Sequence, residues 1–169
     1  MILKTDRLTL SPLSLGDYDF FKIVNQDKSV REFLWDGVLM SEDALTEILE
    51  RNEKHFKQDS FGLYKLTEAD TKIEVGYVGL WPFFDDQQPQ LLYAVLPAYH
   101  GKGYATEGAA IVIRHAFDVL GYSHLIASMD KPNTKSSAVC ERLGFELVGE
   151  RQLDEKSLVF YKLNNNTVL

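Results

Sequence analysis

A glycine-rich turn in the middle of the chain has the residue types of a phosphate-binding loop. Between a strand pattern that stops at Pro97 and an amphipathic helix pattern, the chain reads His100-Gly101-Lys102-Gly103-Tyr104-Ala105-Thr106-Glu107. Glycine reaches backbone conformations barred to other residues, and it lets a ligand touch backbone N–H groups. A turn that runs into a helix N-terminus gathers unpaired N–H donors and a partial positive charge. The turn therefore predicts a pyrophosphate site.

Two common phosphate loops do not fit the spacing of this turn. A Walker loop needs four residues between its first glycine and a Gly-Lys-Ser/Thr, and the chain has no such run. A dinucleotide loop needs a third glycine where Thr106 stands, and an acid at the end of a second strand about 20 residues later. Asp118 falls on the same predicted helix instead. A purely structural turn is the remaining alternative for Gly-x-Gly on its own.

A second motif lies downstream, over residues 133–145. It begins at Asn133 and reads Asn-Thr-Lys-Ser-Ser-Ala-Val-Cys-Glu-Arg-Leu-Gly-Phe. Together the two motifs resemble those of the Gcn5-related N-acetyltransferase (GNAT) superfamily and, within it, the ribosomal-protein N-acetyltransferase (RimJ/RimL)-like branch. The resemblance covers nearly the whole chain, including the strand patterns at Arg7–Leu10 and Gly76–Leu80. It implies an enzyme that takes acetyl-CoA as co-substrate, moves the acetyl group to an amine and uses no metal.

The resemblance assigns most of the expected site to acetyl-CoA. Backbone N–H groups from Gly101 through Thr106 are expected to hold the pyrophosphate, while Val95 and Leu96 hydrogen-bond the pantetheine arm. The Asn133 side chain is expected to contact the same arm. The expected acetyl-CoA-binding residues are Val95, Leu96, His100, Gly101, Lys102, Gly103, Tyr104, Ala105, Thr106, Asn133 and Ser136. Candidates for the distal phosphates, with simple solvation as the alternative, are Lys102, Lys131 and Lys135.

The catalytic groups are expected from the needs of thioester aminolysis. The reaction requires a neutral amine, a stabilised oxyanion and a protonated leaving thiol. The resemblance implies that the backbone N–H of Val95 points towards the thioester oxygen. Much of the superfamily protonates the thiol with a Tyr on the last helix, but Cys140 stands there in this chain. Ser136 is therefore the candidate acid, with helix capping as its alternative role.

No general base can be read from the sequence. Family members often carry a Glu on the fourth strand, but the matching residue here is Gln90, which cannot take a proton. The replacements open to the chain are Asp85, Asp86 or a chain of waters.

The acceptor is expected to be a cationic amine. Residues 1–100 hold 17 acids and 10 Lys/Arg, whereas residues 101–142 hold 4 acids and 5 Lys/Arg. An α-amine with a pKa near 8 is substantially neutral at pH 7–8, whereas a lysine side chain with a pKa near 10.4 is not. A protein or peptide N-terminus, such as a basic one, is the first prediction, and a polyamine, antibiotic or amino-acid derivative is the second. A non-catalytic acyl-CoA-binding module is a third. Expected pocket residues, each of which could instead belong to the core, are Phe33, Trp35, Trp81, Phe83 and Tyr93.

The whole chain reads as one α/β domain over residues 1–169. Strand patterns lie near residues 7–13, 60–66, 74–84, 90–96, 124–128, 145–150 and 158–163, with helix patterns at 14–24, 29–33, 41–56, 105–120 and 133–143. The resemblance implies a single-domain GNAT fold. Its central sheet would be mixed but mostly antiparallel, with six to seven strands splayed between strands 4 and 5 and helices on both faces.

The composition limits which partners and which location are expected for the protein. The 169 residues carry a net charge of −7, which argues against a nucleic-acid partner. No run approaches the ~20 apolar residues of a membrane span, and the first residues do not form a signal peptide. The single cysteine excludes an intrachain disulfide. A cytoplasmic monomer or homodimer is expected.

Overall fold

The computed structural model describes residues 1–84 and 88–167, and it divides their strands between two sheets. The first sheet has the order β1-β2-β3-β4-β5, with every neighbouring pair antiparallel. The second has the order β6-β8-β7, also antiparallel. The strands are β1 (Leu3–Lys4), β2 (Leu8–Pro12), β3 (Leu63–Glu68), β4 (Glu74–Trp81), β5 (Gln90–Val95), β6 (His124–Asp130), β7 (Glu146–Leu153) and β8 (Lys156–Asn164).

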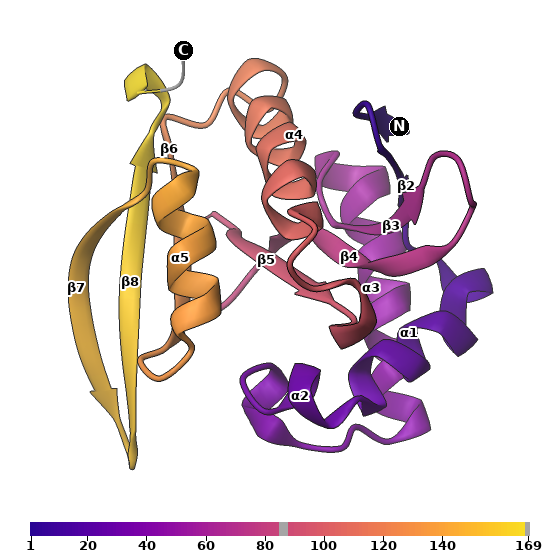
Figure 1. Cartoon of the computed structure of the whole chain (residues 1–169), viewed down its shortest axis with the longest axis horizontal. Coiled ribbons are helices and arrows are strands. Elements are labelled where there is room, and N and C mark those ends of the chain that lie inside the picture. The colour runs from indigo at the N-terminus through magenta and orange to yellow at the C-terminus, as the bar shows by residue number, and fades with distance from the viewer. Residues whose placement is uncertain (85–87, 168–169) are drawn as a thin grey trace.

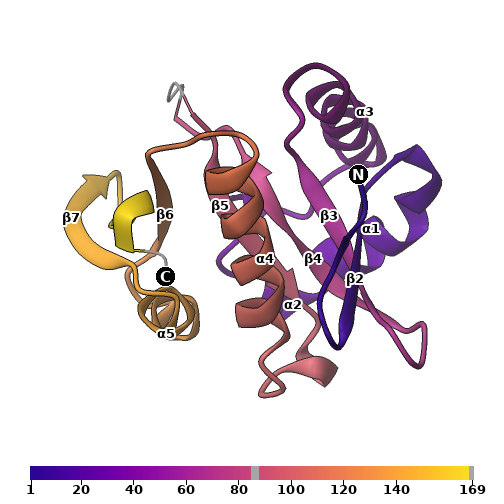
Figure 2. The same cartoon turned by 90° about the horizontal axis from the view of Figure 1, so that it is seen from above.

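The helices cover both faces of the first sheet and one face of the second (Figures 1 and 2). The α-helices are α1 (Tyr18–Gln26), α2 (Lys28–Arg31), α3 (Glu42–Asp59), α4 (Tyr104–Asp118) and α5 (Thr134–Arg142). Short 3-10 turns are η1 (Leu15–Asp17), η2 (Trp35–Gly37), η3 (Pro97–Tyr99) and η4 (Asn165–Thr167). No helix among the described residues is both long enough and apolar enough to cross a membrane.

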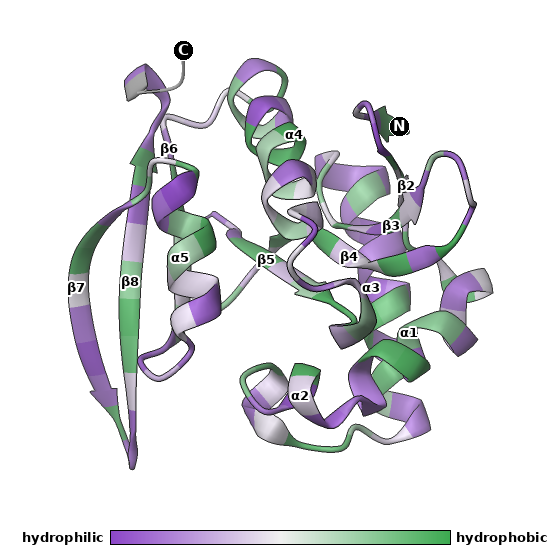
Figure 3. Cartoon of the chain, viewed as in Figure 1, coloured by the Kyte–Doolittle hydropathy of each residue, from purple (hydrophilic) through white to green (hydrophobic). Residues whose placement is uncertain are grey.

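Two hydrophobic cores follow from this layering. Helix α4 packs Val112 and Ala116 against one face of the first sheet, which includes Leu66 and Val78. Helices α1 and α3 cover the other face. Seven of the eight residues of β4 are buried, as expected for a strand covered on both faces. The edge strand β7 is exposed along its whole length, and its lower part in Figure 3 is hydrophilic.

The predicted fold is confirmed: this is an α/β molecule built on a largely antiparallel, divided sheet. The division falls between β5 and β6, which lie side by side without belonging to one sheet. The short β1 adds one strand ahead of those expected from the sequence, so this is the split foreseen between strands 4 and 5. Helix α5 covers the second sheet, and the space between the two sheets receives residues from both.

Candidate active site

A cleft of about 1340 Å³ lies where the two sheets part. Its walls come from β5, β6, the start of α5, the turn that leads into α4, and the segment that includes α2. All the residues from Tyr99 through Thr106 line it, as do Val95, Asn133 and Ser136. The structure thus gathers in one cleft two motifs that are about 30 residues apart in the chain.

Strand β5 turns backbone groups of Val95 towards the cleft. The N–H of Leu96 donates to the carbonyl of Val75 on β4 at 2.9 Å. Alternate residues of an antiparallel strand direct their backbone groups to the same neighbour, so those of Val95 point away from β4. That side of β5 faces β6 and the cleft. Of the two residues expected to meet pantetheine, Val95 offers its N–H to the cleft, whereas that of Leu96 is held by β4.

The turn before α4 has the backbone shape that its glycines suggested. Gly101 and Gly103 have φ angles of 76° and 78°, in the left-handed region that favours glycine. Gly103 is the N-cap of α4, so the first free N–H groups of this 15-residue helix begin there. The hydroxyl of Thr106 is buried and has no hydrogen-bond partner among the described residues. Free amides, an unpartnered hydroxyl and a helix N-terminus fit a diphosphate.

Charged side chains of both signs line the cleft. Its cationic side chains belong to Lys102, Lys135 and Arg142, on the glycine turn and α5. Glu32, which follows α2, is the one carboxylate among the described residues that line the cleft. Lys131, a sequence-based candidate for the distal phosphates, does not line the cleft and instead pairs with Glu150 at 3.1 Å. The glycine turn and the cations therefore suit phosphates, and the Glu32 carboxylate suits a cation.

The start of α5 separates the roles of Asn133 and Ser136. Asn133 is the N-cap, and its Oδ1 accepts the N–H of Ser136 at 3.3 Å. The alternative role for Ser136, that it caps the helix, is wrong because Asn133 performs it. Ser136 lines the cleft, and its hydroxyl has no hydrogen-bond partner among the residues described.

Tyr93 links the two sides of the cleft. Its hydroxyl donates to the carbonyl of Ser136 at 2.8 Å, so β5 is tied to the first turn of α5. The same oxygen lies 3.6 Å from Sγ of Cys140. Burial raises the pKa of the Tyr93 phenol well above its usual range, and burial also raises that of Cys140 to about 11. Both groups are protonated at neutral pH, so the Cys140 thiol is not a ready nucleophile.

The aromatic residues expected in the acceptor pocket fall into two groups. Phe33 and Tyr93 line the cleft. Trp35 and Trp81 do not line it. Their rings pack edge to face with centroids 6.0 Å apart. Trp81 belongs to the core beneath α1 and α3, and Trp35 packs against that core. The indole N–H of Trp35 donates to Oδ1 of the buried Asn25 at 3.0 Å. The prediction that Trp35 and Trp81 line the acceptor pocket is therefore replaced by a structural role for both. Phe83 packs against the same core.

Gln90 has a structural role at the junction of the sheets. It is buried, and its Oε1 accepts the hydroxyl of Ser128 on β6 at 2.6 Å. This bond ties the start of β5 to β6 across the division between the sheets. The alternative bases Asp85 and Asp86 lie outside the described residues. Glu32 could not be selected from the sequence, because its place on the cleft wall depends on how the segment that includes α2 packs.

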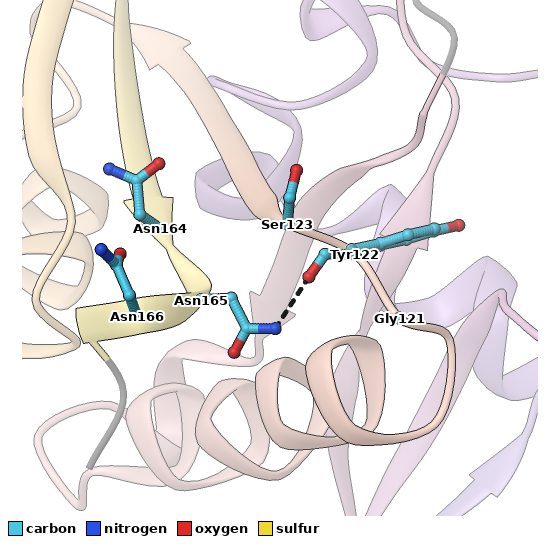
Figure 4. Close-up of a pocket in the computed structure, with 6 residues that line it drawn as sticks. All are labelled: Gly121, Tyr122, Ser123, Asn164, Asn165 and Asn166. Carbon is cyan, nitrogen blue, oxygen red and sulfur yellow. Dashed lines mark hydrogen bonds between the residues drawn. The ribbon is translucent and has the colours of Figure 1, made fainter.

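A second hollow, of about 660 Å³, lies at the opposite end of α4 (Figure 4). It is lined by uncharged residues from 121–123 and 164–166. The side-chain amide of Asn165 crosses it to donate to the carbonyl of Tyr122 at 3.1 Å. Since 15 helical residues span about 22 Å, this hollow is remote from the glycine turn.

Comparison with known proteins agrees with the fold. A family model described as "Acetyltransferase (GNAT) domain" matches residues 7–146. The uncharacterized N-acetyltransferase YnaD of Bacillus subtilis (strain 168) is 23% identical over 149 residues, 88% of this chain and 85% of the relative. Spermidine N(1)-acetyltransferase of Escherichia coli (strain K12) is 24% identical over 148 residues, 83% and 74% of the two chains.

Among solved structures, the ribosomal L7/L12 alpha-N-protein acetyltransferase RimL in complex with coenzyme A superposes with a TM-score of 0.80. The match is 14% identical in sequence and covers 97% of this chain and 98% of that one, so it shows a shared fold. The family model, by contrast, extends over most of this sequence and includes the glycine turn and Asn133. The chain therefore belongs to the GNAT family and is an N-acetyltransferase with acetyl-CoA as its co-substrate.

Proposed function

We propose that this enzyme acetylates a primary amine on a cationic acceptor, first of all the α-amine of a protein or peptide N-terminus. The observation that carries the proposal is the charge of the cleft lining, in which Lys102, Lys135 and Arg142 stand on the glycine turn and α5, and Glu32 is the one carboxylate among the described lining residues. The turn and Lys135 would hold the phosphates of CoA. The wall formed by Phe33 and Glu32 would receive the acceptor.

The residues of the cleft divide the chemistry as follows. The N–H of Val95 would stabilise the oxyanion that forms on the thioester carbonyl. The free hydroxyl of Ser136 would give its proton to the departing thiol sulfur. An α-amine asks little of a base, because a substantial fraction is neutral at pH 7–8. This matches a cleft whose described lining has Glu32 as its one carboxylate.

A polyamine is the second candidate acceptor, and a specific comparison favours it. The 24%-identical relative from Escherichia coli is a spermidine N(1)-acetyltransferase. A polyamine would use the same carboxylate for a distal ammonium group. The proposal of an N-terminal acceptor also includes membership of the RimJ/RimL-like branch, which the two motifs suggest, and a cytoplasmic location. Membership of the GNAT family disfavours the non-catalytic module.

The acceptor class can be tested with a panel of amines. Release of free CoA thiol is followed with basic, neutral and acidic peptides bearing free or blocked N-termini, and with spermidine and spermine. The proposal expects basic peptides with a free N-terminus to react fastest, with a gain of one acetyl group by intact mass. Turnover confined to polyamines would transfer the proposal to the second candidate. Turnover confined to neutral or acidic amines would contradict both.

Glu32 gives a sharper form of the same test. Replacing it as Glu32→Gln should raise the KM for the cationic acceptor about 2- to 5-fold, since an exposed ion pair contributes about 0.2–1 kcal/mol. The KM for acetyl-CoA should not change. Glu47→Gln is the matched control, because Glu47 is exposed on α3 and does not line the cleft. Equal effects of the two substitutions on the acceptor KM would rule out a specific role for Glu32.

A further inference from the structure

Arg7 joins the start of β2 to the glycine turn and to the first turn of α4. Its Nε donates to Oε2 of Glu107 at 2.6 Å, and its Nη2 lies 2.5 Å from the same oxygen. Its Nη1 donates to the backbone carbonyl of Lys102 at 2.9 Å. The backbone N–H of Arg7 also donates to Glu107, at 3.2 Å. One guanidinium therefore holds a side chain of the helix and a carbonyl of the turn together.

We infer that Arg7 is a positioning residue for CoA: it fixes the glycine turn in the conformation that directs backbone N–H groups at the pyrophosphate. The inference rests on the proposed place of CoA in this cleft. Arg7 itself does not line the cleft, so it would act through the turn rather than by touching the ligand.

The geometry of the peptide bond explains how this works. The C=O and N–H of a trans peptide unit point in opposite directions. Because Arg7 holds the carbonyl of Lys102 on the β2 side, the N–H of the next residue, Gly103, is turned to the other side. Gly103 lines the cleft and is the N-cap of α4. Holding one carbonyl in this way orients the amide at the mouth of the helix.

The ring of Tyr104 limits the other movements of the turn. The Arg7 guanidinium lies 5.0 Å from the centre of this ring, and the Tyr104 hydroxyl donates to Glu68 on β3. The carboxylate of Glu107 also receives the hydroxyl of Thr5 at 2.5 Å. The turn and the first residues of α4 are thus fastened to β2 and β3 on the side away from the cleft.

Arg7 has a second effect, which is electrostatic. Glu107 stands in the first turn of α4, where an unpaired carboxylate would repel a bound diphosphate. Burial acts to raise the pKa of Glu107, but hydrogen bonds from Thr5 and Arg7 outweigh it and lower the pKa overall. The carboxylate is therefore ionised at neutral pH, and the guanidinium offsets its charge beside the phosphate site.

The test measures CoA binding by isothermal titration calorimetry in wild type, Arg7→Met, Arg7→Lys and a control, Arg51→Met. Arg51 also lies over an aromatic ring, that of Trp81, but it is on α3 and does not line the cleft. Hydrogen bonds to charged groups contribute enough that Arg7→Met should raise the Kd about 10- to 100-fold. Arg7→Lys keeps the charge without the planar fork, so it should still bind at least 5-fold more weakly than wild type. Arg51→Met should bind as wild type does.

Two further readouts separate positioning from general damage. In Arg7→Met the KM for acetyl-CoA should rise with the Kd, while kcat and the acceptor KM change less than 3-fold. Amide hydrogen exchange over residues 101–106, without ligand, should quicken in both Arg7 variants. Circular dichroism and thermal unfolding report whether each variant is folded. If Arg7→Met does not fold, the test is made with Arg7→Lys.

The outcomes are distinct for the two proposals. A wild-type protein that does not bind CoA would overturn the placement of CoA in the cleft and the inference with it. Tight binding by wild type with unchanged Kd in folded Arg7→Met or Arg7→Lys would overturn the role of Arg7 alone. Equal weakening by Arg51→Met would mean that the loss is not specific to the turn.

Discussion

At the scale of single residues, Ser136 is the group that we propose to protonate the leaving thiol. Its helix is capped by Asn133, and its own backbone is held at both ends, by Asn133 and by Tyr93. Ser136 thus has a fixed backbone on the wall of the cleft, while its hydroxyl remains unbonded to any described residue. Cys140 is fully buried and is not among the residues that line the cleft, so we assign the proton transfer to Ser136 and not to this thiol.

Replacing this hydroxyl should slow the chemical step. General acid catalysis contributes about 100-fold or more, so Ser136→Ala should lower kcat by about 100-fold and leave the KM for acetyl-CoA nearly unchanged. Ser137→Ala is the matched control, since its hydroxyl contacts Met129 and the carbonyl of Asn133 and the residue does not line the cleft. Steady-state kinetics at saturating acceptor measure the difference. Full activity in Ser136→Ala would remove Ser136 from the mechanism.

The raised pKa of Cys140 predicts a loss of stability in alkali. Burial raises this pKa from 9.0 to about 11, so folding favours the protonated thiol. The contribution is fully present below pH 9 and is lost as the pH rises towards 11. Between pH 8 and 10.5, wild type should lose about 2 kcal/mol more of its free energy of unfolding than Cys140→Ala does. Urea titrations of both proteins at the two pH values measure this, and parallel losses would show that the thiol is not linked to folding.

At the scale of elements, the glycine turn and α4 form the unit on which the site depends. The local sequence predicted this unit well, because left-handed glycines, a preceding proline and a helical pattern are all short-range signals. Position along the chain could not show that Leu96 would donate to β4, or that Lys131 would pair with Glu150. Those outcomes depend on register and on the packing of distant strands.

Two glycines with the same backbone geometry allow an effect on CoA binding to be distinguished from an effect on stability. Gly101 and Gly121 have φ angles of 76° and 73°, and a Cβ at either would meet no atom within 4 Å. Alanine should cost each position about 1–2 kcal/mol of stability because of the left-handed backbone. Only Gly101→Ala should also weaken CoA binding, since Gly121 lies beyond the far end of α4. Chemical denaturation and calorimetry test both statements, and equal CoA affinity in the two variants would contradict the role of the turn.

At the scale of the whole molecule, a divided sheet opens a cleft that we propose receives both acetyl-CoA and the acceptor. The α/β class, the split and the family were all predictable, because strand and helix patterns and two spaced motifs fix them together. The assignment of Trp35 and Trp81 to a pocket was wrong, because an aromatic pattern does not distinguish a cleft wall from a second core. Arg7 and Glu107 are 100 residues apart, so their contact could be seen only in three dimensions.

The central claim, that the cleft holds CoA by the amides of the glycine turn, is tested most directly by hydrogen exchange with and without saturating CoA. The prediction is slower exchange over residues 101–106 and at Val95, with little change in β7 and β8. Binding of CoA that protects another part of the molecule and leaves residues 101–106 unchanged would contradict it.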